Sequence, residues 1–344
     1  GTFPGGVLLI KGKENTLKHR AYGLKSETPG EEAMELGTIF DLASLTKVVA
    51  TTTIALQLVE TGNWNLDNPV SKYLARFHNQ DISLKHLLTH TSGLIPWTDL
   101  FSGTGCRDEA LSRLFTDNWP ILEPVVPPGE RVIYSDLNFI LLGLALEEVG
   151  GGNLEQLARE YVFDPLGMAN TGFKPEPEVK QRIAPTEDSP IRGELIRGEV
   201  HDQNCYALGG VSGHAGLFST AEDLGRFSGA LLNGGSLDGN RILGEAMVNL
   251  LSRNFTKGAG DRRTLGWQLQ GEEAETAGDL LSRESFGHTG FTGGSIWLDP
   301  ANGLTTVFLS NRVHPERNRG KERMADFRAE LHNAVLSRKA GSGF

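Results

Sequence analysis

The segment Phe40-Asp41-Leu42-Ala43-Ser44-Leu45-Thr46-Lys47 opens a long apolar stretch that ends near Gly62. No proline or glycine occurs between Ser44 and Glu60, and Leu, Ile, Val, Ala and Thr dominate both faces of a helix drawn through these residues. This composition predicts a buried helix that has Ser44 in its first turn and Gly62 at its C-terminal stop.

Ser44 and Lys47 stand three residues apart, so their side chains share one face of the predicted helix. A hydroxyl is a poor nucleophile unless a neighbouring base takes its proton, and a desolvated lysine can be that base. None of the other lysines follows a serine at this spacing. Taken alone, however, the pair fits an N-capping serine and a lysine that reaches solvent, and this stretch by itself favours that simpler interpretation.

The composition narrows the possible partners. A chain of 344 residues is long enough for about two domains and a substantial core. Its net charge of −10 argues against nucleic acid or an anionic membrane as the main partner, and no apolar run is long enough to span a bilayer. The chain begins directly on a predicted strand, without a recognisable signal peptide. Cys106 and Cys205 could pair or stay free.

Predicted strands lie at the two ends of the chain and predicted helices lie between them. Strands are expected at 5–11 and 17–23, and again at 265–269, 285–288, 294–298 and 304–309, before a closing helix over 321–338. Short helices are expected at 82–89, 108–115, 136–149 and 154–162. We therefore predict an α+β fold: an α/β/α sandwich whose antiparallel central sheet comes from both chain ends. Residues 1–62 and 205–344 would form this discontinuous domain, with a mainly helical domain, 63–204, inserted into it.

Two further stretches carry side chains suited to catalysis. Tyr134 lies in an irregular junction, 127–136, from which its hydroxyl could project into a cleft. His288-Thr289-Gly290 ends a predicted strand, where Gly290 would permit close backbone approach and the Phe291 N–H could donate to a substrate oxygen. Each stretch alone also fits an ordinary role, as a tyrosine with one satisfied hydroxyl or as a plain strand end.

Together, in this order, the three motifs resemble those of the serine hydrolases related to β-lactamases and penicillin-binding proteins. Their signature is Ser-x-x-Lys, then Tyr-x-Asn or Ser-x-Asn, then Lys-Thr-Gly or His-Thr-Gly. The likeness extends to Leu87–Leu94, to Pro128–Gly143, to His201-Asp202 and to Gly209–Ser219, and it covers nearly the whole chain. It resembles the class C-like branch and a penicillin-binding-protein-like subgroup most.

The resemblance implies an acyl-enzyme mechanism that needs no metal or organic cofactor. Ser44 would attack a carbonyl carbon, while Lys47 and Tyr134 would remove its proton and later protonate the leaving group. The N–H groups of Ser44 and Phe291 would hold the developing oxyanion. Thr289 and Gly290, beside His288, would line the substrate site.

Two departures from the family pattern bear on the substrate. Asp136 stands where many relatives carry asparagine, and an ionised carboxylate cannot donate a hydrogen bond to a substrate carbonyl. A charged Asp136 would also favour the protonated amine of Lys47, which shifts proton abstraction towards Tyr134 unless Asp136 is itself protonated; Asn138 could take the place of the missing amide. His288 replaces the usual lysine and is only partly charged near neutrality. Both changes lower the expectation of efficient β-lactam hydrolysis.

Several histidines raise the question of metal. His86 and His90 lie four apart on a predicted helix without a third ligand nearby, which favours capping or packing. His201, Asp202 and His214 form a more suggestive set, although a hydrogen-bonded clamp on the Gly209–Gly216 loop explains them without an ion. We therefore predict no metal, with these three as the remaining candidates.

The sequence predicts a serine hydrolase that cleaves an amide or an ester. A D-alanyl peptide bond or a small carboxylic ester is the preferred substrate, with a peptidoglycan-type peptide or another small molecule as the partner. The alternatives are a true β-lactamase and a protein that is acylated without turnover, as a sensor or sink. Trp97 and Phe101 could line an acyl pocket. Family resemblance alone leads us to expect export to the periplasm or beyond, and the sequence leaves the oligomeric state open.

Overall fold

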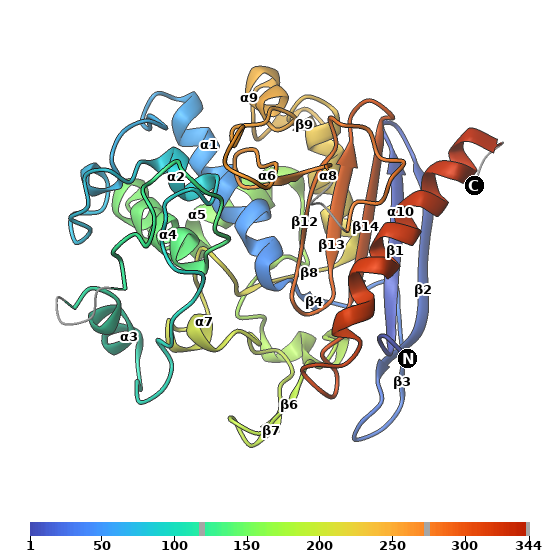
Figure 1. The fold of residues 1–344 in the computed structure, drawn as a ribbon. Coiled ribbons are helices and arrows are strands. Elements are labelled where there is room, and N and C mark those ends of the chain that lie inside the picture. The colour runs from blue at the N-terminus through green and yellow to red at the C-terminus, as the bar shows by residue number, and fades with distance from the viewer. Residues whose placement is uncertain (117–120, 272–275, 342–344) are drawn as a thin grey trace.

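The computed structural model describes residues 1–116, 121–271 and 276–341, and a seven-stranded antiparallel sheet is its main element (Figure 1). The strands follow the order β11-β12-β13-β14-β1-β2-β3. Their bounds are β11 Gln268–Leu269, β12 Phe286–Thr289, β13 Ser295–Asp299, β14 Leu304–Ser310, β1 Gly5–Gly12, β2 Thr16–Ser26 and β3 Glu32–Ala33. Because β1 pairs with β14, the two ends of the chain meet in the middle of one sheet, as predicted.

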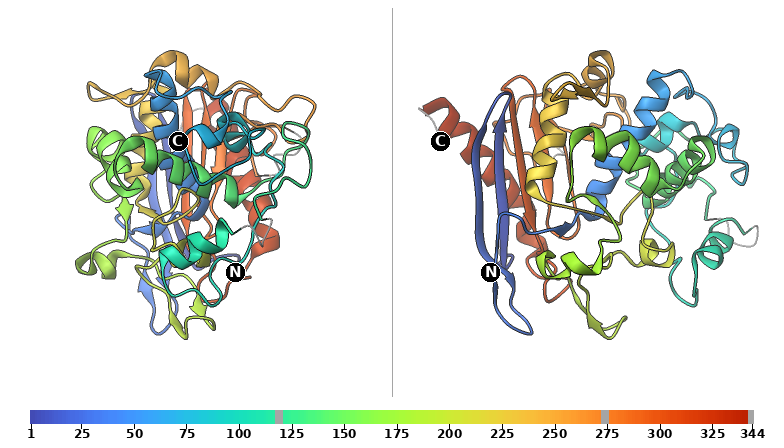
Figure 2. Two further views of the ribbon diagram at one scale, coloured as in Figure 1. Left: turned by 90° about the vertical axis from the view of Figure 1, so that its left-hand side faces the viewer. Right: turned by 180° about the vertical axis from the view of Figure 1, so that it is seen from behind.

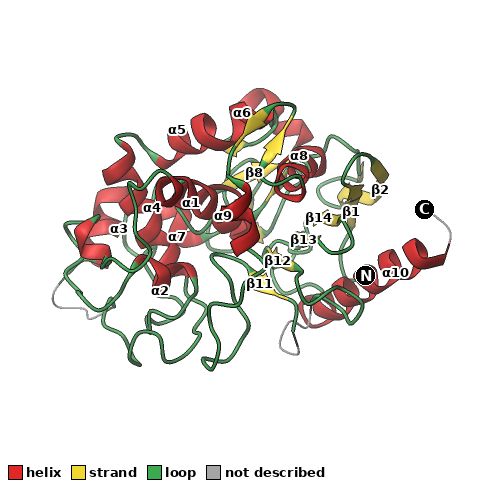
Figure 3. Ribbon diagram, turned by 90° about the horizontal axis from the view of Figure 1, so that it is seen from above, coloured by secondary structure: helices red, strands yellow, loops and turns green. Residues whose placement is uncertain are grey.

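Helices cover both faces of this sheet (Figure 3). Helix α10 (Met324–Gly341) packs on one face, where Leu8, Ile10, Trp297 and Phe308 form a cluster with its apolar side chains. Helix α8 (Ala221–Leu232) packs on the other face, against β1 and β14. The strand residues of β14 are buried throughout, since both faces are covered. The predicted α/β/α sandwich is therefore confirmed.

The helical segment that carries Ser44 is not a regular α-helix. It begins as a 3-10 turn at Ala43–Leu45, widens into a π-helix over Lys47–Thr52, and becomes the α-helix α1 only at Thr53–Glu60. The Thr53 hydroxyl donates to the carbonyl oxygen of Val48, five residues earlier, at 3.0 Å, which fits the wider turn. The prediction of one buried helix was right about its position and burial but wrong about its backbone geometry.

The remaining helices lie to the side of the sheet away from α10 (Figure 2). They are α2 Leu84–Leu88, α3 Arg107–Leu114, α4 Asp136–Gly150, α5 Leu154–Ala158 with a π-helical turn at Arg159–Phe163, α6 Asp164–Leu166, α7 Gln203–Ala207 and α9 Glu245–Leu250. Two small hairpins, β6 Asp188–Ser189 with β7 Glu194–Leu195 and β9 Ser236–Leu237 with β10 Asn240–Arg241, lie outside the main sheet. Among the described residues, no helix is both long and apolar enough to cross a membrane.

A second, three-stranded sheet connects the two halves of the molecule. Its order is β4 (Phe40–Asp41), β8 (Leu217–Ser219) and β5 (Gly172–Phe173), so a strand from the predicted insert pairs with one outside it. One large apolar cluster also runs through both parts. The division into 1–62 with 205–344 and 63–204 stays a prediction.

Two details differ from expectation or settle an open question. Of the strand expected at 265–269, only Gln268–Leu269 pairs, because Gly266 adopts a φ of +81° and its N–H donates to the carbonyl oxygen of Leu88 at 2.9 Å. Cys106 is exposed and Cys205 is buried, and both are free thiols.

Candidate active site

A cleft of about 800 Å³ brings together residues that are far apart in the sequence. Its walls come from the start of the Ser44 helix, the Trp97 loop, the start of α4, the 187–215 region and the end of β12. Its lining residues are Ala43, Ser44, Trp97, Tyr134, Asp136, Glu187, Ile191, His201, Asp202, Gln203, His214, Ala215, Arg263, Gln268, His288, Thr289, Phe291 and Arg317. Trp97 lines the cleft as expected, whereas Phe101 does not.

At the floor of the cleft, the Lys47 ammonium contacts three oxygen atoms. It donates to Ser44 Oγ at 2.9 Å and to the carbonyl oxygen of His214 at 3.0 Å, and it pairs with Asp136 Oδ1 at 2.7 Å. The lysine side chain is wholly buried, whereas Ser44 is half-buried and opens onto the cleft. The predicted Ser44–Lys47 pairing therefore exists, with Asp136 as its third member.

The charge of Lys47 follows from this environment. Burial disfavours the ammonium, but the Asp136 carboxylate and Tyr134 outweigh burial and raise the pKa of Lys47 above its ordinary value. Lys47 is consequently a cation at neutral pH. A resting role as the proton acceptor for Ser44, which the sequence allowed, does not agree with this geometry.

Tyr134 lies beside the same ammonium, two residues before the start of α4. Its ring centroid is 5.2 Å from Lys47 Nζ and 5.5 Å from the guanidinium carbon of Arg263, and the residue is 36% exposed. His90 supports it from below: the two rings are 4.5 Å apart, and the Ser135 N–H donates to His90 Nδ1 at 3.1 Å. Burial keeps the pKa of His90 well below its usual range, so this support is a neutral imidazole.

Asn138 does not replace the amide that Asp136 lacks. Its side-chain oxygen accepts from Ser92 Oγ at 2.6 Å and its nitrogen lies 3.2 Å from His90 Nδ1, so it is buried beneath Tyr134 and outside the cleft. His86 caps α2 together with Ser83, which confirms the capping role expected for it.

The His288-Thr289-Gly290 turn ends β12 beside the nucleophile segment, as predicted. A Cβ atom on Gly290 would lie 2.5 Å from the carbonyl oxygen of Leu42, so only glycine fits this close approach. Phe291 is 40% exposed and lines the cleft, and among the described residues its N–H has no hydrogen-bond acceptor. This N–H is therefore available to a substrate oxygen.

His288 is not the cation of the cleft. Burial, with further contributions from Arg263 and Lys47, lowers its pKa to about 3, and its Nδ1 lies 2.8 Å from the carbonyl oxygen of Thr289. The expected partial charge near neutrality is therefore wrong. Arg263 supplies a positive charge instead: its Nε donates to Asp261 at 2.8 Å, and its two Nη groups have no acceptor among the described residues.

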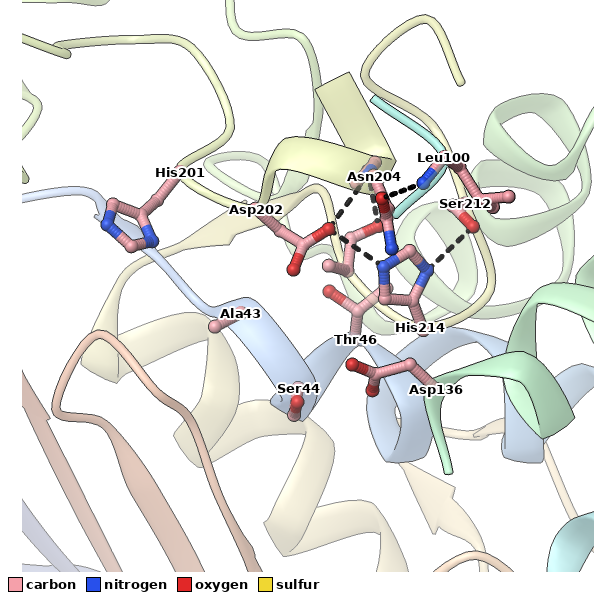
Figure 4. Close-up of polar contacts among 12 residues, drawn as sticks. Ala43, Ser44, Thr46, Leu100, Asp136, His201, Asp202, Asn204, Ser212 and His214 are labelled. Atoms are coloured by element: carbon pink, nitrogen blue, oxygen red, sulfur yellow. Dashed lines mark hydrogen bonds and ion pairs between the residues drawn. The ribbon is translucent and has the colours of Figure 1, made fainter. Parts of the chain in front are cut away.

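The three metal candidates separate in the structure (Figure 4). His214 Nε2 lies 2.9 Å from Asp202 Oδ1, and His214 Nδ1 lies 2.8 Å from Ser212 Oγ. His201 instead turns away and pairs with Glu187 at 2.7 Å. Asp136 lies close to Asp202 and His214, but both ring nitrogens of His214 are engaged and the Lys47 ammonium already lies beside these carboxylates. Asp202 and Ser212 thus hold the His214 side chain, and the carbonyl oxygen of His214 accepts from Lys47.

Residues 1–331 match the protein family described as Beta-lactamase. The chain belongs to the β-lactamase family. A protein of Escherichia coli (strain K12) named "Putative D-alanyl-D-alanine carboxypeptidase" is 32% identical over 92% of this chain and 81% of its own length. The "N-acetylmuramyl-L-alanine amidase" of Bacillus subtilis (strain 168) is 31% identical over 92% of this chain and 80% of its own.

Two solved structures share the fold. A class C β-lactamase superposes with a TM-score of 0.74 at 18% identity, covering 96% of this chain and 91% of its own. EstCE1, described as a hydrolase with promiscuous acyltransferase activity, reaches 0.74 at 23% identity, covering 96% and 94%. The chain is thus a serine hydrolase of the β-lactamase family, similar to proteins named as carboxypeptidase, amidase, hydrolase and β-lactamase.

Sequence reasoning missed three residues of this β-lactamase-family site. Arg263 precedes a short strand and Arg317 lies in a charged run that reads as solvated surface, so neither carries a local signal. Asp41 was part of the motif segment but had no assigned role. The apolar residue before it and the helix after it offered a clue, since a carboxylate placed there is buried and needs hydrogen-bond donors.

Proposed function

We propose that this serine hydrolase forms an acyl ester on Ser44 and cleaves a D-alanyl-type peptide bond whose leaving group carries a free carboxylate. The observation that carries the proposal is the 2.9 Å contact between Ser44 Oγ and the buried Lys47 ammonium in a cleft that Tyr134 also lines. The names of the relatives favour peptidoglycan-type substrates. Such substrates lie outside the cytoplasmic membrane, and we propose export on that ground.

In the proposed mechanism Tyr134 is the general base. Because Lys47 is already an ammonium, it cannot accept the Ser44 proton until it has passed its own to a neighbour. The Tyr134 ring has the Lys47 and Arg263 cations within 5.2 and 5.5 Å of its centroid, and two nearby positive charges favour a negative charge on its oxygen during the reaction. Lys47 would hold Ser44 Oγ in place, pass one of its own protons to the Tyr134 oxygen and accept the Ser44 proton in return. Tyr134 would then protonate the leaving amine. The N–H groups of Ser44 and Phe291 would bind the oxyanion.

Arg263 favours a substrate that bears a carboxylate. Its free Nη groups form the planar fork that binds a carboxylate through two hydrogen bonds. The neutral His288 provides no charge for this purpose. A small carboxylic ester is a second candidate, because exposed apolar side chains of Trp97, Ile191 and Phe291 surround the cleft and suit an apolar acyl group. β-Lactam hydrolysis and acylation without turnover stay alternatives.

Intact-mass spectrometry of wild type and Ser44→Ala tests the proposal. Each protein is incubated with a D-Ala-D-Ala peptide, a nitrophenyl acetate ester and a fluorescent penicillin while released product is followed. Release of D-alanine that depends on Ser44 supports the peptidase. Turnover of the ester alone favours the esterase, and a lasting adduct without product favours a sensor or sink. Unchanged rates in Ser44→Ala would remove the nucleophile assignment.

A further inference from the structure

Asp41 does not line the cleft, yet its oxygen atoms bind three separate parts of the active site. Oδ1 accepts from the Ala43 N–H at 2.8 Å, and Oδ2 accepts from the His201 N–H at 2.7 Å. Its main-chain carbonyl oxygen accepts from Thr292 Oγ1 at 2.7 Å. Asp41 is 3% exposed, and both carboxylate oxygens bind main-chain N–H groups.

One of these bonds fixes the nucleophile. Ala43, the residue just before Ser44, has a φ of +46°, a left-handed conformation that a residue with a Cβ rarely adopts. Strained backbone of this kind persists only where its surroundings hold it. The Asp41 carboxylate accepts the hydrogen bond of Ala43 in this conformation, and the direction of the following N–H, that of Ser44, depends on it.

The other two bonds fix Phe291. Thr292, the next residue, is 1% exposed and ties the turn to the Asp41 carbonyl oxygen. His201, held by Oδ2, stacks its ring against that of Phe291, with centroids 5.7 Å apart and an interplanar angle of 21°. The two backbone segments touch here, because a Cβ on Gly290 would meet the Leu42 carbonyl oxygen at 2.5 Å.

We propose that Asp41 is a positioning residue that sets the separation and direction of the Ser44 and Phe291 N–H groups, and thereby the oxyanion site. Donors that stabilise an oxyanion must be held in place before the reaction, since the gain depends on their geometry at the transition state. Asp41 provides this, because its carboxylate accepts from the Ala43 and His201 N–H groups and its carbonyl oxygen accepts from the Thr292 hydroxyl. The inference rests on the proposed function, in which these two N–H groups receive the substrate oxygen.

A matched pair of variants at Thr292 tests it. Thr292→Val keeps the shape but removes the hydroxyl that binds Asp41, whereas Thr292→Ser keeps the hydroxyl. We expect Thr292→Val to lower kcat for nitrophenyl ester hydrolysis about tenfold or more with KM within about twofold, and Thr292→Ser to retain most of kcat. The inhibition constant of phenylboronic acid, which adds to a serine as a tetrahedral anion, should rise in Thr292→Val in proportion to the loss of kcat.

Asp41→Asn should show the same pattern, because the amide nitrogen replaces one carboxylate oxygen and cannot accept from the N–H group that this oxygen bound. If this variant does not fold, the Thr292 pair still tests the Phe291 side of the proposed site, where Thr292 binds the main-chain carbonyl oxygen of Asp41. Equal kcat in Thr292→Val and Thr292→Ser, or equal loss in both, would overturn the role of the hydroxyl. Ser44→Ala is measured alongside. Full activity in Ser44→Ala would refute the proposed function itself. Loss of activity in Ser44→Ala, together with unchanged kcat in both Thr292 variants, would refute the positioning role of Asp41 alone.

Discussion

Lys47 and Asp136 form an ion pair at the floor of the cleft, with Nζ and Oδ1 2.7 Å apart. The lysine is fully buried and the side chain of Asp136 is 20% exposed. An asparagine at position 136 would leave the ammonium without this carboxylate. The aspartate therefore stabilises the charged form of the lysine on which the site is built.

Asp136→Asn should lower the free energy of unfolding by about 3 kcal/mol at pH 7, because removal of one partner leaves a buried charge uncompensated. Urea denaturation measures this. Since the fold raises the pKa of Lys47, the stabilisation is fully present below pH 10.5, the value of a free lysine, and is lost only as the pH rises through the folded value. The contribution of the pair to wild-type stability should hence be constant from pH 7 to 9.

The control for this prediction is Asp164→Asn. Asp164 pairs with Arg159 at 3.4 Å on the surface, with both side chains mostly exposed, and its loss should cost less than about 0.5 kcal/mol. A similar small loss in both variants would show that the Lys47–Asp136 pair contributes little.

Tyr134→Phe should slow acylation of Ser44 by about 100-fold or more, because it removes the proposed general base. Stopped-flow or quenched-flow mass spectrometry measures the acylation rate. Tyr206→Phe is the matched control, since Tyr206 is similarly exposed but lies on α7 outside the cleft. An undiminished acylation rate in Tyr134→Phe would show that another group is the general base.

Arg263→Met should raise KM about tenfold or more for a peptide with a free C-terminal carboxylate, because it removes a charge-assisted hydrogen-bond pair. KM for a neutral nitrophenyl ester should change little, since that substrate has no carboxylate for the guanidinium. Arg253→Met, an exposed arginine outside the cleft, serves as control. An equal rise for both substrates would indicate general damage to the cleft and not carboxylate recognition.

The buried His332 should make the fold sensitive to acid. Burial lowers its pKa to about 4, below the 6.5 of a free histidine, so the unfolded chain takes up a proton between these values that the folded chain does not. The stabilisation is present above pH 6.5 and is lost as the pH falls towards 4, by about 1.4 kcal/mol per pH unit. His332→Asn should reduce this slope in urea denaturation between pH 6 and 4.5, and parallel slopes would contradict the prediction.

The motif residues and the elements that carry them were predictable from local pattern. Alternation and glycine placement located β1, β2 and β12 to β14, and the apolar spacing located α4 within a residue. The π-helical turn after Ser44 was not predicted, because the apolar pattern of this segment is the same for an α-helix and for the wider turn that the structure shows. His201 and Asp202 are neighbours in sequence, yet His201 pairs with Glu187 whereas Asp202 lies beside His214, and spacing along the chain does not show this difference.

By itself the sequence determined that Ser44 and Lys47 share a helix face, that Tyr134 lies in an irregular segment, and that His288-Thr289-Gly290 ends a strand. It also determined which family the chain resembles. These are properties of spacing along one chain segment. Only the tertiary structure decided the charges: Lys47 stays protonated and His288 stays neutral because burial and the nearby ions Asp136 and Arg263 set their pKa values. It also decided that Asp41 contacts both Ala43, before Ser44, and Thr292, after Phe291. Electrostatic and hydrogen-bond partners are neighbours in space, and residues 41, 201 and 292 meet only once the chain has folded.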